Sequence, residues 1–125
     1  MKIRIKGNFI RYRLTQSEVK ALSEGKRLEE RTCFGPADQQ TFVYALETAE
    51  NIEGLQASFD GRTITLFMPA SAADTWHAEE RVGFENEQEV APGVVLKILL
   101  EKDFACLDTS HDDQADKYPN PKLMC

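Results

Sequence analysis

The segment IRIKGNFIRYRL, residues 3–14, aligns without a gap with ASFDGRTITLFM, residues 57–68, at an offset of 54 positions (57 − 3). The same offset continues over the longer segments 3–47 and 57–101, where apolar residues stay apolar although few identities remain. Such drift is typical of a duplicated supersecondary unit. We therefore predict two copies of one unit, each consisting of a hairpin, a short helix and a second hairpin.

The alternation of polarity in the first copy predicts the register of its first hairpin. Apolar and polar residues alternate on both sides of a Gly-Asn pair at 7–8, which suits a two-residue turn. This turn pairs Ile5 with Ile10 and Ile3 with Tyr12. All four apolar side chains then share one face, which we expect to be buried.

Turn, cap and breaker residues predict the remaining elements. Thr15 to Glu18 fits a capping box and starts a helix over 16–24, and Pro69 starts a second helix over 70–78. In the second copy, a turn at 60–61 or at 61–62 keeps the same faces, so the register of that hairpin stays open by two residues. The other predicted strands cover residues 27–34, 41–47, 55–59, 62–68, 82–86 and 94–101.

These units predict an α+β fold, mainly β, in which two hairpin–helix–hairpin repeats are related by a pseudo-twofold axis. The strands form either a barrel or two packed sheets, and the helices cover its open sides. Residues 1–101 form one domain, and residues 102–125 form an acidic C-terminal strap or tail that Phe104, Leu107 and Tyr118 anchor. The predicted core consists of Ile3, Ile5, Ile10, Tyr12, Leu14, Val19, Leu22, Phe42, Tyr44, Leu46, Ile64, Leu66, Met68, Trp76, Val82, Leu96, Ile98 and Leu100.

The composition fits one soluble domain. With 125 residues, 42% of them apolar, the chain is long enough for one core but too short for two. No apolar run approaches the ~18 residues of a membrane span, and no signal-peptide block opens the sequence, so we expect a cytoplasmic protein. Cysteines at 33, 106 and 125 lack framework spacing and suggest reduced thiols. The net charge of −6 argues against nucleic acid as the main partner, because phosphates require a basic face.

Positive charge is concentrated at the N-terminus. Residues 1–13 hold five basic residues and no acidic one, whereas the other 112 (125 − 13) hold 10 basic (15 − 5) and 21 acidic residues. The predicted register places Lys2, Arg4, Arg11 and Arg13 on the polar face of the first hairpin. Guanidinium groups there suit a phosphate or carboxylate ligand. Alternatively, the face is solvated, or neighbouring Glu residues or the acidic tail neutralise it.

A second candidate site lies toward the C-terminus. Cys106, His111 and Asp112 are metal-ligand types, but their spacing matches no established pattern, so we favour no metal and predict no cofactor. Cys33 suggests a buried apolar thiol, and His77 suggests a cap at a helix end. If the tail crosses the barrel near these two residues, they join Cys106 and His111 in a metal-binding or small enzymatic site.

Together these features favour a small non-enzymatic binding or adaptor domain. No nucleophile elbow, phosphate-binding glycine-rich loop or paired-histidine motif occurs in the sequence. The expected partner is a small anion or an acidic protein that binds the basic hairpin face, and the site in the tail is the alternative. The pseudo-twofold axis relates two copies of the unit within one chain, as the axis of a homodimer relates two subunits. We therefore expect a monomer or a weak dimer.

Two resemblances extend this interpretation. The segments KIRIKG (2–7), LTQSEV (14–19), EKDF (101–104) and YPNP (118–121) resemble a small family of uncharacterised bacterial proteins, which implies a bacterial source and no particular activity. The segment DGRTITL (60–66), followed by Pro69 and a short helix, resembles the core of AbrB-type swapped-hairpin transcription factors and related double-psi barrels. The second resemblance implies topology only, because Glu79 and Glu80 stand where that family has a Gly-Asp turn.

Overall fold

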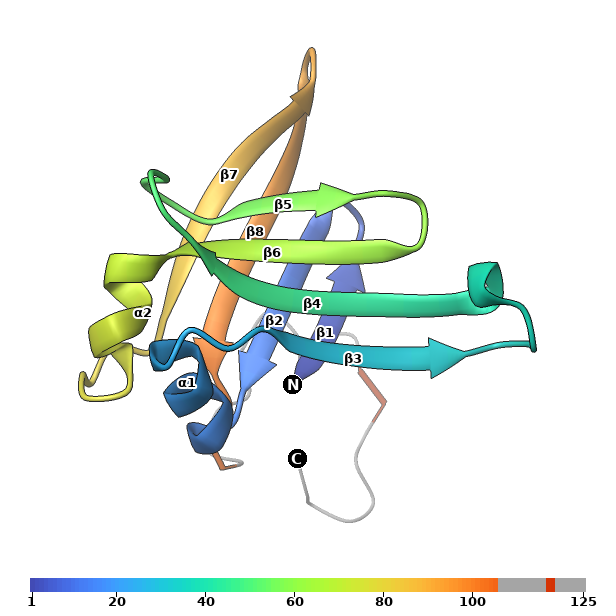
Figure 1. Cartoon of the computed structure of the whole chain (residues 1–125). Helices are drawn as coiled ribbons and strands as arrows, with labels where there is room; N and C mark the ends of the chain where they lie inside the picture. The colour runs from blue at the N-terminus through green and yellow to red at the C-terminus, as the bar shows by residue number, and fades with distance from the viewer. Residues whose placement is uncertain (106–116, 119–125) are drawn as a thin grey trace.

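The computed structural model describes residues 1–105 and 117–118, which form an α+β fold dominated by strands (Figure 1). Two four-stranded sheets pack together without closing into a barrel: sheet A has the order β1-β2-β8-β7 and sheet B the order β3-β4-β6-β5. The elements are β1 (Lys2–Lys6), β2 (Phe9–Leu14), α1 (Gln16–Ser23), β3 (Leu28–Cys33), a 3-10 turn (Asp38–Gln40), β4 (Thr41–Ala49), β5 (Gln56–Phe59), β6 (Thr63–Pro69), α2 (Ala70–Trp76), β7 (Gly83–Ala91) and β8 (Val94–Lys102). We predicted either a barrel or two packed sheets, and the structure has two packed sheets.

Each sheet takes one hairpin from each half of the chain. In sheet A, β2 runs parallel to β8 and Ile10 lies opposite Ile98. In sheet B, β4 runs parallel to β6 and Tyr44 lies opposite Ile64. By the offset of 54, Ile64 is the counterpart of Ile10 (10 + 54) and Tyr44 is the counterpart of Ile98 (98 − 54). The two parallel pairings therefore have the same register. This equality supports a pseudo-twofold relation between the halves.

The hairpin turns repeat this equivalence in their hydrogen bonds. The Lys97 N–H donates to the carbonyl oxygen of Asn8 at 2.9 Å, and the Val43 N–H donates to that of Arg62 at 3.1 Å. These bonds are counterparts under the same offset, since Asn8 corresponds to Arg62 and Lys97 to Val43. Each first-hairpin turn is therefore attached to a strand from the other half.

The second copy adopts the 61–62 turn of the two that its sequence allowed. Phe59 lies opposite Ile64, which leaves Gly61 and Arg62 at the turn. Gly61 has a φ of 96°, in the left-handed region that favours glycine. The Asp60 carboxylate accepts hydrogen bonds from the N–H groups of Thr63 at 2.7 Å and Arg62 at 2.9 Å, and these bonds lower the pKa of Asp60. The side chain of Asp60 thus selects the turn.

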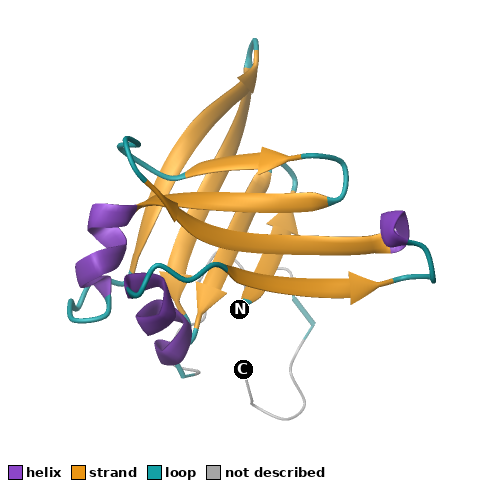
Figure 2. Ribbon diagram, in the orientation of Figure 1, coloured by secondary structure: helices purple, strands orange, loops and turns teal. Residues whose placement is uncertain are grey.

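The helices begin where expected but occupy one side of the molecule. Thr15 caps α1 and forms the predicted capping box with Glu18, while Pro69 stands at the N-cap of α2. We expected the helices to cover the open sides of the barrel or of the two packed sheets. In the structure, α1 and α2 contact each other and lie next to one another (Figure 2). The reason is the crossing of the hairpins, which brings β2 and β6 to the same side of the molecule at their C-terminal ends.

Most of the predicted core is buried, and the exceptions lie at strand ends. Ile5 and Val82 are exposed by 54% and 53%, because Ile5 is next to a hairpin turn and Val82 precedes β7. Val43 and Ala45, which we did not predict, are buried on the outer face of β4, where β3 and β6 flank this strand on both sides. Partly buried side chains packed on the core include the predicted residues Ile3, Phe42, Tyr44 and Leu96.

The edge of β5 is closed by one amide side chain. Gln88 of β7 accepts a hydrogen bond from the Ala57 N–H at 2.8 Å and donates one to the Ala57 carbonyl at 2.9 Å. Next to it, Asn86 donates to the carbonyl of Leu55 at 2.7 Å. A primary amide that pairs with both backbone groups of one residue replaces the neighbouring strand that an edge lacks. These contacts also connect sheet A to sheet B.

Replacing Gln88 by Met should destabilise the fold, because Met keeps most of the volume but neither hydrogen bond to Ala57. We expect a loss of about 1–2 kcal/mol in the free energy of unfolding, measured by urea denaturation. Gln56→Met, at an exposed position of β5, is the matched control and should stay within about 0.5 kcal/mol of wild type. Equal stabilities of the two variants would contradict the role of the amide.

The N-terminal ammonium group and Glu18 form an ion pair at the start of α1. The ammonium of Met1 contacts the Glu18 carboxylate and lies 3.4 Å from Glu30. Burial acts to raise the pKa of Glu18, but hydrogen bonds from the ammonium and from Thr15 outweigh it, so the pKa is lowered overall. A carboxylate with a lowered pKa stabilises the fold above its unfolded-state pKa, and this contribution disappears as the pH falls through its folded-state pKa.

Glu18→Gln should therefore cost stability in a pH-dependent way. Gln also fits the capping box, so the substitution removes mainly the charge. We expect the variant to be less stable than wild type by about 0.5–1 kcal/mol at pH 7, and the difference to shrink and disappear as the pH falls below the unfolded-state pKa of Glu18 and through its lowered folded-state pKa. Urea denaturation across this range measures it. A difference that stays constant with pH would show that the ion pair does not contribute.

Candidate functional site

The basic residues of the first hairpin lie together on the outer face of sheet A. β1 and β2 pair in the predicted register, with Lys2 opposite Arg13, Arg4 opposite Arg11 and Lys6 opposite Phe9. Since Ile10, Tyr12 and Leu14 are buried on the inner face, the alternate residues must point outward. We call Lys2, Arg4, Lys6, Arg11 and Arg13 the basic face.

Two carboxylates of the same chain neutralise part of the basic face. Glu101 of β8 accepts from Arg13 Nε at 2.7 Å and lies 3.3 Å from Arg11 Nε, through the same oxygen. The Lys2 ammonium lies 3.2 Å from Asp103. Arg4 also has an interaction partner. Carboxylates of the same chain therefore pair with Lys2, Arg11 and Arg13, which is one of the alternatives that the sequence allowed. Glu101 lies between the two arginines.

The charges on sheet A are graded from one edge to the other. Within residues 1–105, two carboxylates, Glu101 and Asp103, lie among the five basic side chains of β1 and β2, and Arg4 has an interaction partner besides. At the opposite edge, β7 carries Glu85, Glu87 and Glu89 at alternate, exposed positions. The outer face of this sheet is therefore basic along β1 and acidic along β7.

A separate cleft of about 430 Å³ lies beside the helices. His77 and Asp103 line it, together with Lys20 and Lys102. The Lys102 ammonium donates to the carbonyl of Glu79 at 2.6 Å and so ties the end of β8 to the segment after α2. The cleft combines an imidazole, a carboxylate and two ammonium groups, and this is where the chain leaves β8.

Cys33, one of the proposed partners of His77, does not lie at this cleft. Cys33 ends β3, and Figure 1 shows this strand running away from the helices to the opposite side of the molecule. Cys33 is exposed, contrary to the predicted buried thiol, because it lies at the tip of a hairpin, where its Sγ is 3.7 Å from the Thr41 hydroxyl. Cys106, His111 and Asp112 lie outside the described residues. Within residues 1–105 and 117–118, no three His, Cys, Asp or Glu side chains are arranged to hold a metal ion.

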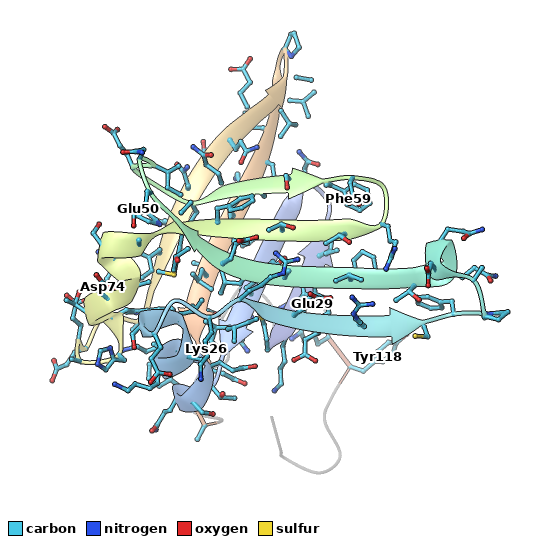
Figure 3. All side chains as sticks on the ribbon, viewed as in Figure 1. Lys26, Glu29, Glu50, Phe59, Asp74 and Tyr118 are labelled. Carbon is cyan, nitrogen blue, oxygen red and sulfur yellow. The ribbon has the colours of Figure 1, made fainter. Side chains whose placement is uncertain are left out.

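The anchors expected for the C-terminal segment are exposed where they are described. The side chain of Tyr118 is almost fully exposed (Figure 3), and that of Phe104 is about half exposed. Leu107 lies outside the described residues. The contacts that attach the start of this segment are polar: the Asp103 N–H donates to the carbonyl of Leu14 at 2.7 Å, and the Asp103 carboxylate pairs with Lys2.

Sequence reasoning missed Glu101, although the repeat contained a signal. Glu101 and Glu47 occupy equivalent positions (47 + 54) and keep their identity, while most other positions differ. In the other half, Glu47 accepts a hydrogen bond from Arg27 at 2.5 Å. A glutamate retained at the end of the last strand of each copy thus binds an arginine in both halves, although the arginines themselves are not equivalent.

Comparison with known proteins agrees with the resemblance over the whole chain. The model of a family of unknown function, DUF7009, matches residues 1–122. No curated protein and no solved structure matches the chain. The expected membership of an uncharacterised family is therefore confirmed. The bacterial source and the likeness to AbrB-type proteins stay predictions. None of the helices described is both long and apolar enough to cross a membrane.

Replacing Glu101 by Gln should destabilise the fold, because Arg11 and Arg13 would keep their charges without the carboxylate between them. The side chains of Glu101 and Arg11 are about four-fifths buried, so screening is incomplete. We expect a loss of about 1–2 kcal/mol, measured by urea denaturation at low ionic strength. Glu87→Gln, on an exposed part of β7, is the control. An unchanged stability of Glu101→Gln would contradict the bridging role.

Proposed function

The chain belongs to the DUF7009 family of unknown function, and we propose that it is a non-enzymatic binding domain whose basic face recognises an acidic protein partner. One observation supports this proposal: five basic side chains share one face of sheet A with only two carboxylates from residues 1–105, Glu101 and Asp103, on a protein whose net charge is −6. Such a local reversal of sign steers a negatively charged partner toward one orientation.

The layout of the charges favours an extended partner over a small anion. Lys2, Arg4 and Lys6 occupy alternate positions of β1, so neighbouring members are separated by roughly 7 Å along the strand. A single phosphate or carboxylate spans one such interval at most. Arg11 and Arg13, which have the geometry to hold a small anion together, already share Glu101. A series of carboxylates on one polypeptide matches the row of cations on β1.

We also propose that the protein acts in the cytoplasm. Cys33 is an exposed, unpaired thiol, and the three cysteines of the chain show no disulfide framework. Thiols of this kind persist where the surroundings are reducing.

The proposal predicts that neutralising the lysines of β1 weakens binding of an acidic peptide. The probe is a fluorescein-labelled, end-blocked peptide of four Val-Glu repeats, and the readout is fluorescence anisotropy. Lys2→Gln/Lys6→Gln should raise the dissociation constant about tenfold, because each exposed ion pair contributes roughly 0.5–1 kcal/mol. The affinity of wild type should fall as salt is added.

The double variant Lys20→Gln/Lys26→Gln is the matched control. It changes the net charge by the same amount on exposed positions at and after α1, away from the basic face. Binding by this variant should equal that of wild type. If both double variants lose affinity equally, the peptide senses only the net charge and the proposal fails. Competition by inorganic phosphate at the peptide's own concentration would point to a small-anion site instead.

A further inference from the structure

The edge of β1 presents backbone groups that its own hairpin leaves unused. In a hairpin with a two-residue turn, the residues flanking the turn exchange hydrogen bonds, and every second residue then does the same. Lys6, Arg4 and Lys2 therefore bond to β2. The N–H and C=O groups of Ile3 and Ile5 point the other way, toward the free side of β1, which is the outermost strand of sheet A.

The second half of the chain demonstrates this geometry directly. Ala57 is the counterpart of Ile3 (3 + 54), and both of its outward backbone groups are paired with the amide of Gln88. The chain therefore closes the edge of β5 at the position that corresponds to Ile3.

The first half lacks this closure. Gln88 lies opposite Leu96, and the equivalent of Leu96 in the first half, Phe42 (96 − 54), lies opposite Thr32. Thr32 therefore takes the place of Gln88, and its side chain forms no hydrogen bond to Ile3 within the described residues. Among residues 1–105 and 117–118, no hydrogen bond to the outward groups of Ile3 or Ile5 occurs. Two pseudo-equivalent edges thus differ: one is sealed by an amide, and the other is open at Ile3 and Ile5.

We propose that the open edge of β1 receives an extended acidic segment of a partner protein, which adds to sheet A as a fifth strand. This inference rests on the proposed function and specifies how the partner is held. Carboxylates at alternate positions of the segment would lie beside Lys2, Arg4 and Lys6 on the outer face. Apolar side chains between them would lie beside Ile3 and Ile5 on the inner face, where Ile5 is half exposed.

Two of the other three edge strands, β5 and β7, suit such a segment less well. At β5, Gln88 occupies the backbone groups of Ala57. At β7, Glu85, Glu87 and Glu89 face outward at alternate positions, so an acidic strand would place like charges side by side. Strand addition supplies backbone hydrogen bonds to any sequence, and the basic face supplies the preference for acidic ones.

The sharpest test changes the peptide and leaves the protein intact. A strand added at an edge forms its hydrogen bonds through every second residue only. Two versions of the Val-Glu peptide, N-methylated either at all Val or at all Glu residues, should therefore behave differently. One set should lose affinity for wild type at least tenfold, and the other should bind within about threefold of the unmodified peptide. The set that fails also reports whether the added strand is parallel or antiparallel.

A variant of the protein tests the same contact from the other side. Ile5→Pro removes one outward N–H and leaves the bonds to β2 in place, and proline is tolerated where a strand's N–H faces solvent. It should reduce affinity at least tenfold, whereas Ile5→Thr, which keeps the N–H and the β-branched shape, should stay within about threefold. Thermal melts establish that both variants are folded; if Ile5→Pro is not, the N-methylated peptides decide alone.

The possible outcomes separate this inference from the proposed function. If both N-methylated peptides bind like the unmodified one, the peptide lies on the basic face without strand pairing, so the inference fails and the proposed function stands. If the unmodified peptide does not bind even at low salt, both fail. If the protein alone forms oligomers that Ile5→Pro dissolves, the occupant of the edge is the acidic β7 of a second copy, and the partner proposed here is wrong.

Discussion

The fold depends on the two parallel strand pairs that join one half of the chain to the other. At their centres, Tyr12 lies opposite Leu100 in sheet A, and Leu46 lies opposite Leu66 in sheet B. All four of these side chains are fully buried. Neither half can complete a sheet alone, because each contributes the first hairpin to one sheet and the second hairpin to the other. The two sheets, the shared core and the contact between the helices therefore form together.

The local parts of this fold could be predicted from the sequence, whereas the exchange of hairpins could not. Alternation around a two-residue turn specifies which residues of a hairpin face each other, and a capping box specifies where a helix starts. Both signals act within about 15 residues, and both predictions were correct for Ile5–Ile10 and for Thr15. The pairing of Ile10 with Ile98 joins distant segments, and the sequence of an apolar strand does not specify which other strand it will pair with. The sequence therefore allowed either a barrel or two packed sheets.

The same limit applies to the candidate site. The basic face was predictable because its register lies within one hairpin. Its carboxylate, Glu101, comes from a strand that is almost the whole chain away, so only the fold could identify it as the partner of Arg11 and Arg13. Exposure was misjudged for a related reason. Ile5 follows the apolar alternation of its strand and Cys33 precedes Phe34, but both residues stand near hairpin ends, where their side chains are exposed.

Because the two halves have the same fold, the features in which they differ are candidates for function. The halves share the turn and register of their first hairpins, the register of the two parallel strand pairs, and the glutamates at 47 and 101. They differ in two features: one first hairpin is basic and the other is not, and within residues 1–105 an amide side chain closes the edge of β5 but not that of β1. Arg4 faces Arg11 directly across β1 and β2, and like charges in that position destabilise a strand pair. Glu101 relieves this repulsion at Arg11, and Arg4 has an interaction partner of its own. An acidic strand at β1 would add carboxylates beside Lys2 and Lys6, at the edge of the sheet that lies farthest from the glutamates of β7.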